Sequence, residues 1–329
     1  MRLVTFQSDT DANDRLGAWV AGDHVIDLAQ AAEHLNCANA AFASMLALIE
    51  AGPRALDAVR RILAADVAEA TLAPGQYRLR APLPVPPQIR DFLCFETHLK
   101  NSIESVIKIR VAASSDPAAA EAALRASGRF QISPVWYEQP VYYKCNRFAV
   151  SGPDETVFWP AYSQLMDYEL ELAAIIGTGG RDIAAADAQN HIFGFTIFND
   201  FTARDAQAKE MEALLGPAKG KDFDKANAFG PCIVTIDEVG DPHQLKMTAR
   251  VNGEIWSEGH SSTMHWRFED MIAHLSQGET LYPGEILGSG TVGRGCGLEL
   301  MRFLNDGDVV ELEIEKIGVL RNRVARRKD

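Results

Sequence analysis

Alternating apolar and polar residues mark short strands at the start of the chain. Three runs show this pattern, at 3–6, 17–20 and 24–27, and a Gly-Asp pair between the second and third runs is a turn signal. Residues 28–68 instead carry Ala, Leu and Ile at helical spacing. The first 80 residues therefore predict a small β-containing domain that also carries helices.

A proline-rich stretch, APLPVPPQ at 81–88, follows this region. Proline removes a backbone donor and fixes φ, so four prolines in eight residues predict a linker. We place a domain boundary here. It divides the chain into an N-terminal domain, 1–83, and a larger domain, 84–329.

The second part of the chain is rich in predicted strands. Residues 112–127 are Ala-rich with scattered charge and predict an exposed helix within an insertion. A helix is also expected to begin near Thr202 and to run through Gln207. Strands are expected at 166–176, 191–199, 231–236, 247–251 and 309–315. The fold class is therefore α+β and strand-rich.

Composition narrows the class of protein. The chain has 329 residues, 47% hydrophobic and 23% charged, with a net charge of −13. Nucleic-acid binding needs a basic face, so we expect no such partner. The apolar runs are too short for a membrane span, and the N-terminus lacks the apolar segment of a signal peptide. The five cysteines are scattered, which predicts free thiols in a reducing compartment. The expected location is the cytoplasm.

Three acids alternate in one predicted strand, Asp167, Glu169 and Glu171, directly before an apolar run. Alternate residues of a strand share a face, so these carboxylates would repel one another unless a cation lies among them. Oxygen ligands favour Mg²⁺, Ca²⁺ or Mn²⁺ over Zn²⁺. The alternative is a solvated outer face of the strand.

A fourth acid, Asp200, ends the apolar strand HIFGFTIFND. At that place a rigid strand could project a carboxylate into a site. The alternative is that Asp200 serves only as a turn residue or helix N-cap, because Thr202 and Asp205 follow in a suitable context.

Residues 166–238 resemble the fumarylacetoacetate hydrolase family. The resemblance rests on MDYELELAAIIG, IFGFTIFNDFTARDAQ and GPAKGKDFDKANAFGPCIVTIDE, and it continues in VNGEIW, STMHW and LYPGEILGSGTVG. It covers about 86–317, and the N-terminal strands resemble the small leading domain of many members. It implies a mixed β-sandwich roll as the larger domain and a homodimer.

The resemblance also implies a ligand set for the metal. Glu169, Glu171 and Asp200 match the family's metal ligands, and Asp167 is then a surface acid or an acid behind the ligands. In the fumarylacetoacetate-cleaving branch a fourth carboxylate lies seven positions before the catalytic His, where this chain has Asp91. Many members lack this ligand. The expected cofactor is Mg²⁺, with Ca²⁺ or Mn²⁺ as alternatives.

His98 falls on the family's catalytic His, at the start of an expected helix. A neutral imidazole can take a proton from water, and a neighbouring carboxylate would orient it. Smaller members place a Glu three positions later, where this chain has Asn101. The resemblance instead indicates Glu299, in GLEL, as the partner. Glu299 could equally be a surface residue, with Glu96 or Glu104 as the partner.

The remaining expected contacts are with the substrate. The resemblance assigns Gln207 and Lys221 to a developing oxyanion and Thr291 to the substrate. Arg204 and Tyr142 are further candidates for substrate binding. Alternatively, Arg204 forms a structural ion pair, and Tyr142, like its neighbour Tyr143, is a core or lid residue.

Gly288 to Gly293 match the spacing GxGxxG. A dinucleotide site also needs a following helix within a βαβ unit, but the remaining residues predict strands. We expect these glycines to let a loop pass close to the substrate.

The predicted activity is metal-dependent hydrolysis of a C–C bond in a small anionic dicarbonyl acid of the acylpyruvate type, such as fumarylacetoacetate, in aromatic catabolism. Alternatives within the family are oxaloacetate decarboxylation, dienoate hydration and isomerisation. A non-catalytic metal or ligand binder is the alternative of another class.

Overall fold

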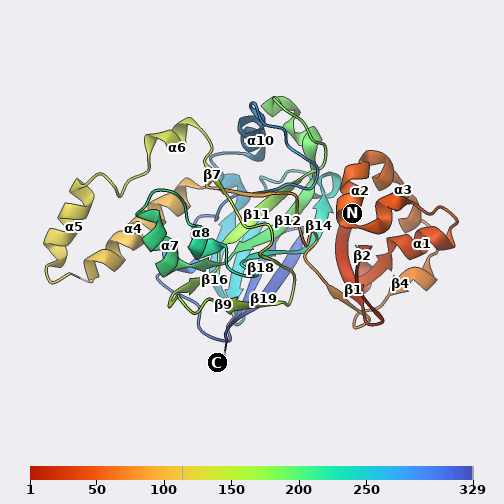
Figure 1. Ribbon diagram of the computed structural model, residues 1–329, viewed down its shortest axis with the longest axis horizontal. Coiled ribbons are helices and arrows are strands. Elements are labelled where there is room, and N and C mark those ends of the chain that lie inside the picture. Colours follow the sequence, from red (N-terminus) through yellow and green to blue (C-terminus); the bar gives the residue numbers. More distant parts are fainter. Residues whose placement is uncertain (113, 328–329) are drawn as a thin grey trace.

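The computed structural model describes residues 1–112 and 114–327 (Figure 1). The N-terminal region is a meander of strands with helices packed on it. Its elements are β1 (Arg2–Ser8), β2 (Asp11–Val20), β3 (His24–Asp27), α1 (Leu28–His34), α2 (Met45–Ala51), α3 (Pro53–Leu63), β4 (Thr71–Leu72) and β5 (Tyr77–Leu79). Apolar side chains of α1, α2 and α3 are buried, as their helical spacing predicts.

These strands extend a large sheet that continues into the second half of the chain. The order is β4-β3-β2-β1-β14-β12-β11-β17-β6-β7. Its later members are β6 (Ile89–Phe92), β7 (Tyr142–Lys144), β11 (Leu170–Ile176), β12 (Ile192–Asp200), β14 (Asn227–Thr235) and β17 (Ile286–Gly288), with β8 (Val150–Ser151) beside β14. Because β1 pairs with β14, the sheet is continuous across residue 83. The boundary there stays a prediction.

A second sheet packs on the first. Its order is β16-β15-β18-β19-β9, formed by β9 (Thr156–Trp159), β15 (Lys246–Val251), β16 (Glu254–His260), β18 (Val309–Ile314) and β19 (Gly318–Arg326). Apolar residues of β11 and β12 share one buried cluster with those of β15 and β18. The fold is the expected strand-rich α+β sandwich.

The predicted strand at 166–176 is interrupted. β10 (Met166–Asp167) pairs with β13 (Thr202–Ala203), and β11 begins only at Leu170. The predicted helix near Thr202 begins two residues later, as α7 (Arg204–Met211). The other short helices are α8 (Ala218–Lys221), α9 (Ile236–Val239), α10 (Phe268–Ser276) and α11 (Gly297–Leu300).

An arm of helices extends from the body of the molecule (Figure 1). It consists of α4 (Glu96–Ala112), α5 (Pro117–Ala126) and α6 (Pro134–Glu138). The Asp116 carboxylate caps α5 by accepting from the backbone N–H of Ala119, and α5 buries none of its residues. This is the exposed helix that the Ala-rich segment predicts.

In the described part of the chain, 1–112 and 114–327, we find no helix both long and apolar enough to cross a membrane.

Candidate active site

Three buried carboxylates converge at one end of neighbouring strands. Asp91 comes from β6, Glu171 from β11 and Asp200 from the end of β12, and one oxygen of each lies within 4.8 Å of the other two. β17 runs between β11 and β6, and a Cβ on its Gly288 would lie 2.5 Å from Asp91 Oδ1 and 3.1 Å from Glu171 Oε2. The glycine therefore leaves the space in which the carboxylates meet.

Glu169 lies outside this group, and its carboxylate is paired with the cationic side chains of Arg204 and Lys221. Its Oε1 is 2.6 Å from Arg204 Nη2, and its Oε2 accepts a hydrogen bond from the Lys221 ammonium. The residue occupies the gap between β10 and β11, where its backbone N–H donates to Asn199 Oδ1 at 3.0 Å. The expected set of four ligands is therefore found as three carboxylates together and one beside them.

Asp167 is buried, so the reading as a surface acid is wrong. Its carboxylate accepts from Arg204 Nε at 2.8 Å and from the backbone N–H groups of Gly297 and Leu298 at 2.7 and 2.9 Å. These last two bonds hold the start of α11, which carries Glu299. Asp167 thus ties β10 to the helix that carries the expected partner of His98.

Lys221 joins Glu169 to the carboxylate group. Its side chain is almost fully buried, and its ammonium donates to both Glu169 and Asp200. Asp200 also accepts from the Tyr143 hydroxyl. Lys221 and Tyr143 both bind Oδ2 of the Asp200 carboxylate, and Oδ1 accepts no hydrogen bond from the described residues.

The carboxylates carry more negative charge than their neighbours neutralise. Burial and the nearby Asp200 charge raise the pKa of Asp91 to about 7. Burial and the charge of Asp91 raise the pKa of Glu171, whereas for Asp200 burial outweighs Lys221 and gives a pKa of about 6. Asp91 Oδ1 and Asp200 Oδ1 are buried and accept no hydrogen bond from the described residues. Unpaired oxygens amid excess negative charge fit a hard divalent cation.

These pKa values predict how stability depends on pH without metal. Asp91 titrates near pH 7 in the folded chain and near 3.8 in the unfolded chain. The protonated carboxyl group of Asp91 therefore contributes fully to the stability of the folded chain below pH 3.8, and this stabilisation is lost as the pH rises through 7. We expect the Tm of metal-stripped protein to fall by several degrees between about pH 5 and pH 8, and the fall to be smaller in Asp91→Asn. Calorimetry checks this, and equal pH profiles for both proteins would contradict it.

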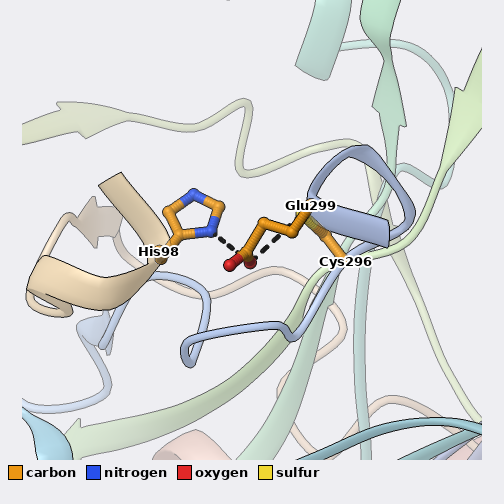
Figure 2. Close-up of side chains that lie close together, drawn as sticks. All are labelled: His98, Cys296 and Glu299. Atoms are coloured by element: carbon orange, nitrogen blue, oxygen red, sulfur yellow. Dashed lines mark hydrogen bonds and ion pairs between the residues drawn. The ribbon is translucent and has the colours of Figure 1, made fainter. Parts of the chain in front are cut away.

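His98 and Glu299 form a hydrogen-bonded pair, although 201 positions separate them (Figure 2). His98 lies in the first turn of α4, with Nδ1 2.7 Å from Glu299 Oε1. Glu299 Oε2 accepts from Asn101 Nδ2 at 2.9 Å and from the backbone N–H of Arg294 at 2.7 Å. Asn101, at the position where the resemblance implies an acid in smaller members, thus binds the carboxylate of Glu299.

The pair is linked to Glu169 by geometry, because Cys296, three residues before Glu299, forms a β-bridge with Glu169. Burial alone would raise the pKa of Glu169, but the charges of Arg204 and Lys221 hold it at about 2. Gly293 lies against Thr97 at the start of α4, where a Cβ would approach the Thr97 side chain to 2.7 Å. The glycine loop after β17 thus packs directly under the helix that carries His98.

The structure brings most of the expected substrate contacts to this site. Gln207 Oε1 accepts from Arg204 Nη1 at 3.0 Å, which turns the amide N–H₂ away from Arg204. Gln207 also packs on Gly220, beside Lys221. Thr291 Oγ1 is 3.4 Å from Glu171 Oε1. Arg204 itself is buried in ion pairs with Asp167 and Glu169, which favours the alternative of a structural role.

Tyr142 does not face the carboxylates. In the pairing of β6 with β7 it lies opposite Phe92, with ring centroids 5.1 Å apart, whereas Tyr143 lies opposite Asp91 and contacts Asp200. The aromatic residue beside the acids is therefore Tyr143, one position further along. The parity of the strand is the signal that could have identified it.

The glycines at 288–293 do not form a dinucleotide site. β17 ends at Gly288, and the next helix is the four-residue α11, which begins at Gly297. Gly288 and Gly293 allow close packing of this loop against its protein neighbours, and the closeness of the loop to a substrate stays a prediction.

Known proteins are similar to this chain in sequence. A family model described as fumarylacetoacetate (FAA) hydrolase C-terminal matches residues 109–325. Human mitochondrial oxaloacetate tautomerase FAHD2A is 41% identical over 190 residues, which are 57% of this chain and 59% of that protein. Mitochondrial oxaloacetate tautomerase fahd2 of Xenopus laevis is 32% identical over 331 residues, 98% of this chain and 90% of that protein. Because these relatives are mitochondrial, the cytoplasmic location stays a prediction.

A solved structure shares the fold over its full length. Maleylpyruvate hydrolase from Sphingobium sp. SYK-6, in complex with manganese(II) ion and pyruvate, superposes with a TM-score of 0.71 at 24% identity and 100% coverage of both chains. The match to the human relative spans little more than half of that protein. The family model and the full-length frog relative together show that this chain belongs to the fumarylacetoacetate hydrolase family.

Proposed function

We propose that this chain is a divalent-metal-dependent hydrolase that cleaves a C–C bond in a small acylpyruvate-type acid. The observation that carries the proposal is the hydrogen-bonded pair of His98 and Glu299, linked through the bridge of Cys296 with Glu169 to the strand that also supplies one of the three buried carboxylates. The pair offers a base, and the carboxylates offer a cation site that could hold an anionic substrate.

Asp91, Glu171 and Asp200 would hold the cation, with Glu169 beside them. A bound cation would polarise a carbonyl oxygen of the substrate and offset the charge of an enolate leaving group. The two unpaired oxygens support this assignment. We propose Mg²⁺, with Mn²⁺ or Ca²⁺ as alternatives, and the manganese in the Sphingobium enzyme is consistent with this class of ion.

His98 would activate water. When Nδ1–H donates to Glu299, Nε2 carries the free lone pair and can take a proton. Glu299 would then stabilise the imidazolium, and its fixed contacts with Asn101 and Arg294 keep the pair aligned. Activated water would attack the distal carbonyl of the substrate, and the C–C bond would break as that carbonyl re-forms.

Lys221 and Gln207 would hold the oxyanion that develops during this attack. Arg204 fixes the orientation of the Gln207 amide, so its N–H₂ is the group left to donate. Preorganised donors of this kind contribute on the order of 3 kcal/mol each to the transition state. The substrate contacts of Thr291, and a homodimer as the assembly, remain part of the same proposal.

Replacement of His98 tests the role of the base. We expect His98→Ala to lower kcat by roughly 10²–10⁴-fold, while the metal-induced rise in Tm stays within about a degree of the wild type because no carboxylate is changed. Acylpyruvate cleavage assays and calorimetry with and without Mg²⁺ measure the two effects. His274→Ala, on α10, is the control. Unchanged turnover would remove His98 from the mechanism.

Oxaloacetate tautomerisation is the second candidate. It is favoured because both relatives described above are named oxaloacetate tautomerases. The same base would then move a proton between carbon and oxygen without an attack by water. Decarboxylation and dienoate hydration use the same cation site. Assays in H₂¹⁸O separate these reactions, since hydrolysis places ¹⁸O in the new carboxylate and tautomerisation leaves no such label.

A further inference from the structure

A second set of side chains that can bind a metal consists of His98, Cys296 and Glu299 (Figure 2). Cys296 Sγ lies 3.5 Å from the Glu299 Oε1 that contacts His98, and one ligand atom from each of the three residues lies within 4.8 Å of the other two. Cys296 is fully buried. It has no role in the hydrolysis proposed above, so its position beside the base requires a separate explanation.

The donor atoms here differ from those of the carboxylate group. One nitrogen, one sulfur and one oxygen form a set typical of Zn²⁺ rather than of Mg²⁺ or Ca²⁺. In a tetrahedral zinc site, sulfur and oxygen ligands lie roughly 3.5 Å apart, which the Cys296–Glu299 separation already matches. The 2.7 Å between His98 and Glu299 would have to open by about 0.7 Å.

Hydrogen bonds to one carboxylate oxygen of Glu299 orient its other oxygen as a metal ligand. Asn101 and the Arg294 backbone N–H both bind Oε2, which leaves Oε1 directed at His98 and Cys296. The backbone of Cys296 is fixed by a β-bridge with Glu169. Groups that fix a ligand from behind are a regular feature of metal sites.

We propose that His98, Cys296 and Glu299 form an inhibitory site for a thiophilic divalent cation such as Zn²⁺. On binding, the Cys296 thiol releases one proton and becomes a thiolate ligand. His98 binds through Nδ1, so the proton of the neutral imidazole moves to Nε2. Nε2 is then a donor, and the base can no longer accept a proton from water.

The binding of a cation is inferred from the positions of the three side chains alone, whereas its inhibitory effect rests on the proposed function of His98. The two are tested with different measurements. In metal-stripped protein, Co²⁺ reports the site directly, because a thiolate ligand gives a near-ultraviolet charge-transfer band that carboxylates do not give. Inhibition by Zn²⁺ is measured separately, with Mg²⁺ in excess.

Cys296→Ser in a Cys37→Ser background is the test, because Cys37 is exposed and could bind the probe itself. Cys232→Ser in the same background is the matched control, since Cys232 is equally buried and bonds Ile317 instead. We expect the cobalt band in the background and in the control, its loss in Cys296→Ser, and Zn²⁺ inhibition roughly 100-fold weaker there. A band that persists in Cys296→Ser would overturn the proposal.

Two further outcomes are informative. A Cys296-dependent band without inhibition by Zn²⁺ would support the site and overturn the role of His98 as base. If Cys296→Ser does not fold, His98→Ala supplies the second test, because the thiolate stays and a nitrogen ligand is lost. Cobalt affinity should then fall at least about tenfold, and unchanged affinity would overturn the proposal.

Discussion

Glu171→Gln is expected to abolish metal binding and turnover while leaving the metal-free protein at least as stable as the wild type. Burial and the charge of Asp91 raise the pKa of Glu171, so without metal the neutral form of its carboxyl group is favoured beside Asp91. A glutamine amide resembles that protonated carboxyl in size and in hydrogen bonding. Its oxygen can still accept from the backbone N–H of Gly290, as Glu171 Oε2 does at 3.1 Å.

The loss of a ligand has the opposite effect on the metal-bound state. Mutation of a residue that hydrogen-bonds to a metal ligand typically lowers metal affinity about 10–100-fold. Removal of a charged ligand itself should cost more, so we expect kcat/KM and Mg²⁺ affinity to fall by more than ~100-fold. Titration calorimetry and thermal unfolding with and without Mg²⁺ measure this. Glu258→Gln, exposed on β16, is the control. Wild-type Mg²⁺ affinity in Glu171→Gln would contradict the ligand assignment.

The alternation of apolar and polar residues predicted most of the strands, but it did not predict the break at residues 168–169. Tyr168 is buried, with its hydroxyl 2.6 Å from Ser257 Oγ in the second sheet. β10 pairs with β13 in a sheet of its own, so Asp167 and Glu171 do not share one continuous face as the alternation predicts. A contact between sheets is a tertiary effect that local periodicity does not contain.

The site residues likewise divide into those that the sequence predicts and those that only the structure identifies. Asp91, Glu171 and Asp200 follow from the resemblance, and the structure adds why they can meet, which is the missing side chain at Gly288. The pairing of His98 with Glu299 could be suggested by resemblance only, because no local pattern links residues 201 positions apart. Tyr143 rather than Tyr142 lies opposite Asp91 in the pairing of β6 with β7, so the parity of β7 identifies the residue beside the acids once this pairing is known.

The Arg204 guanidinium is expected to be the largest single contributor to stability among the charged residues of the site. It is almost fully buried, with Nε 2.8 Å from Asp167 Oδ2 and Nη2 2.6 Å from Glu169 Oε1. The Nη2 hydrogens do not point at an acceptor, so the contact with Glu169 is an attraction of charges rather than a hydrogen bond. Without Arg204, two buried carboxylates would lose their main cation.

Arg204→Met should therefore lower the free energy of unfolding by about 3–5 kcal/mol, the usual cost of breaking a buried pair from one side. Asp167→Asn in the same chain should recover part of this loss, because it removes one of the two stranded charges. Gly297 and Leu298 donate to different oxygens of Asp167, so the single amide oxygen keeps one of these two hydrogen bonds and the recovery is incomplete. Urea unfolding of the two single variants and the double variant measures the coupling.

The same variant separates a structural role from substrate binding. If Arg204 held the substrate, as the sequence allowed, Arg204→Met would raise KM and leave the urea midpoint unchanged. If it holds Asp167 and Glu169, the midpoint falls, and the variant binds Mg²⁺ less tightly because Glu169 loses its position. Arg125→Met is the control, since Arg125 pairs with Glu104 and Glu121 on the exposed arm, where an ion pair contributes little because water already solvates both charges.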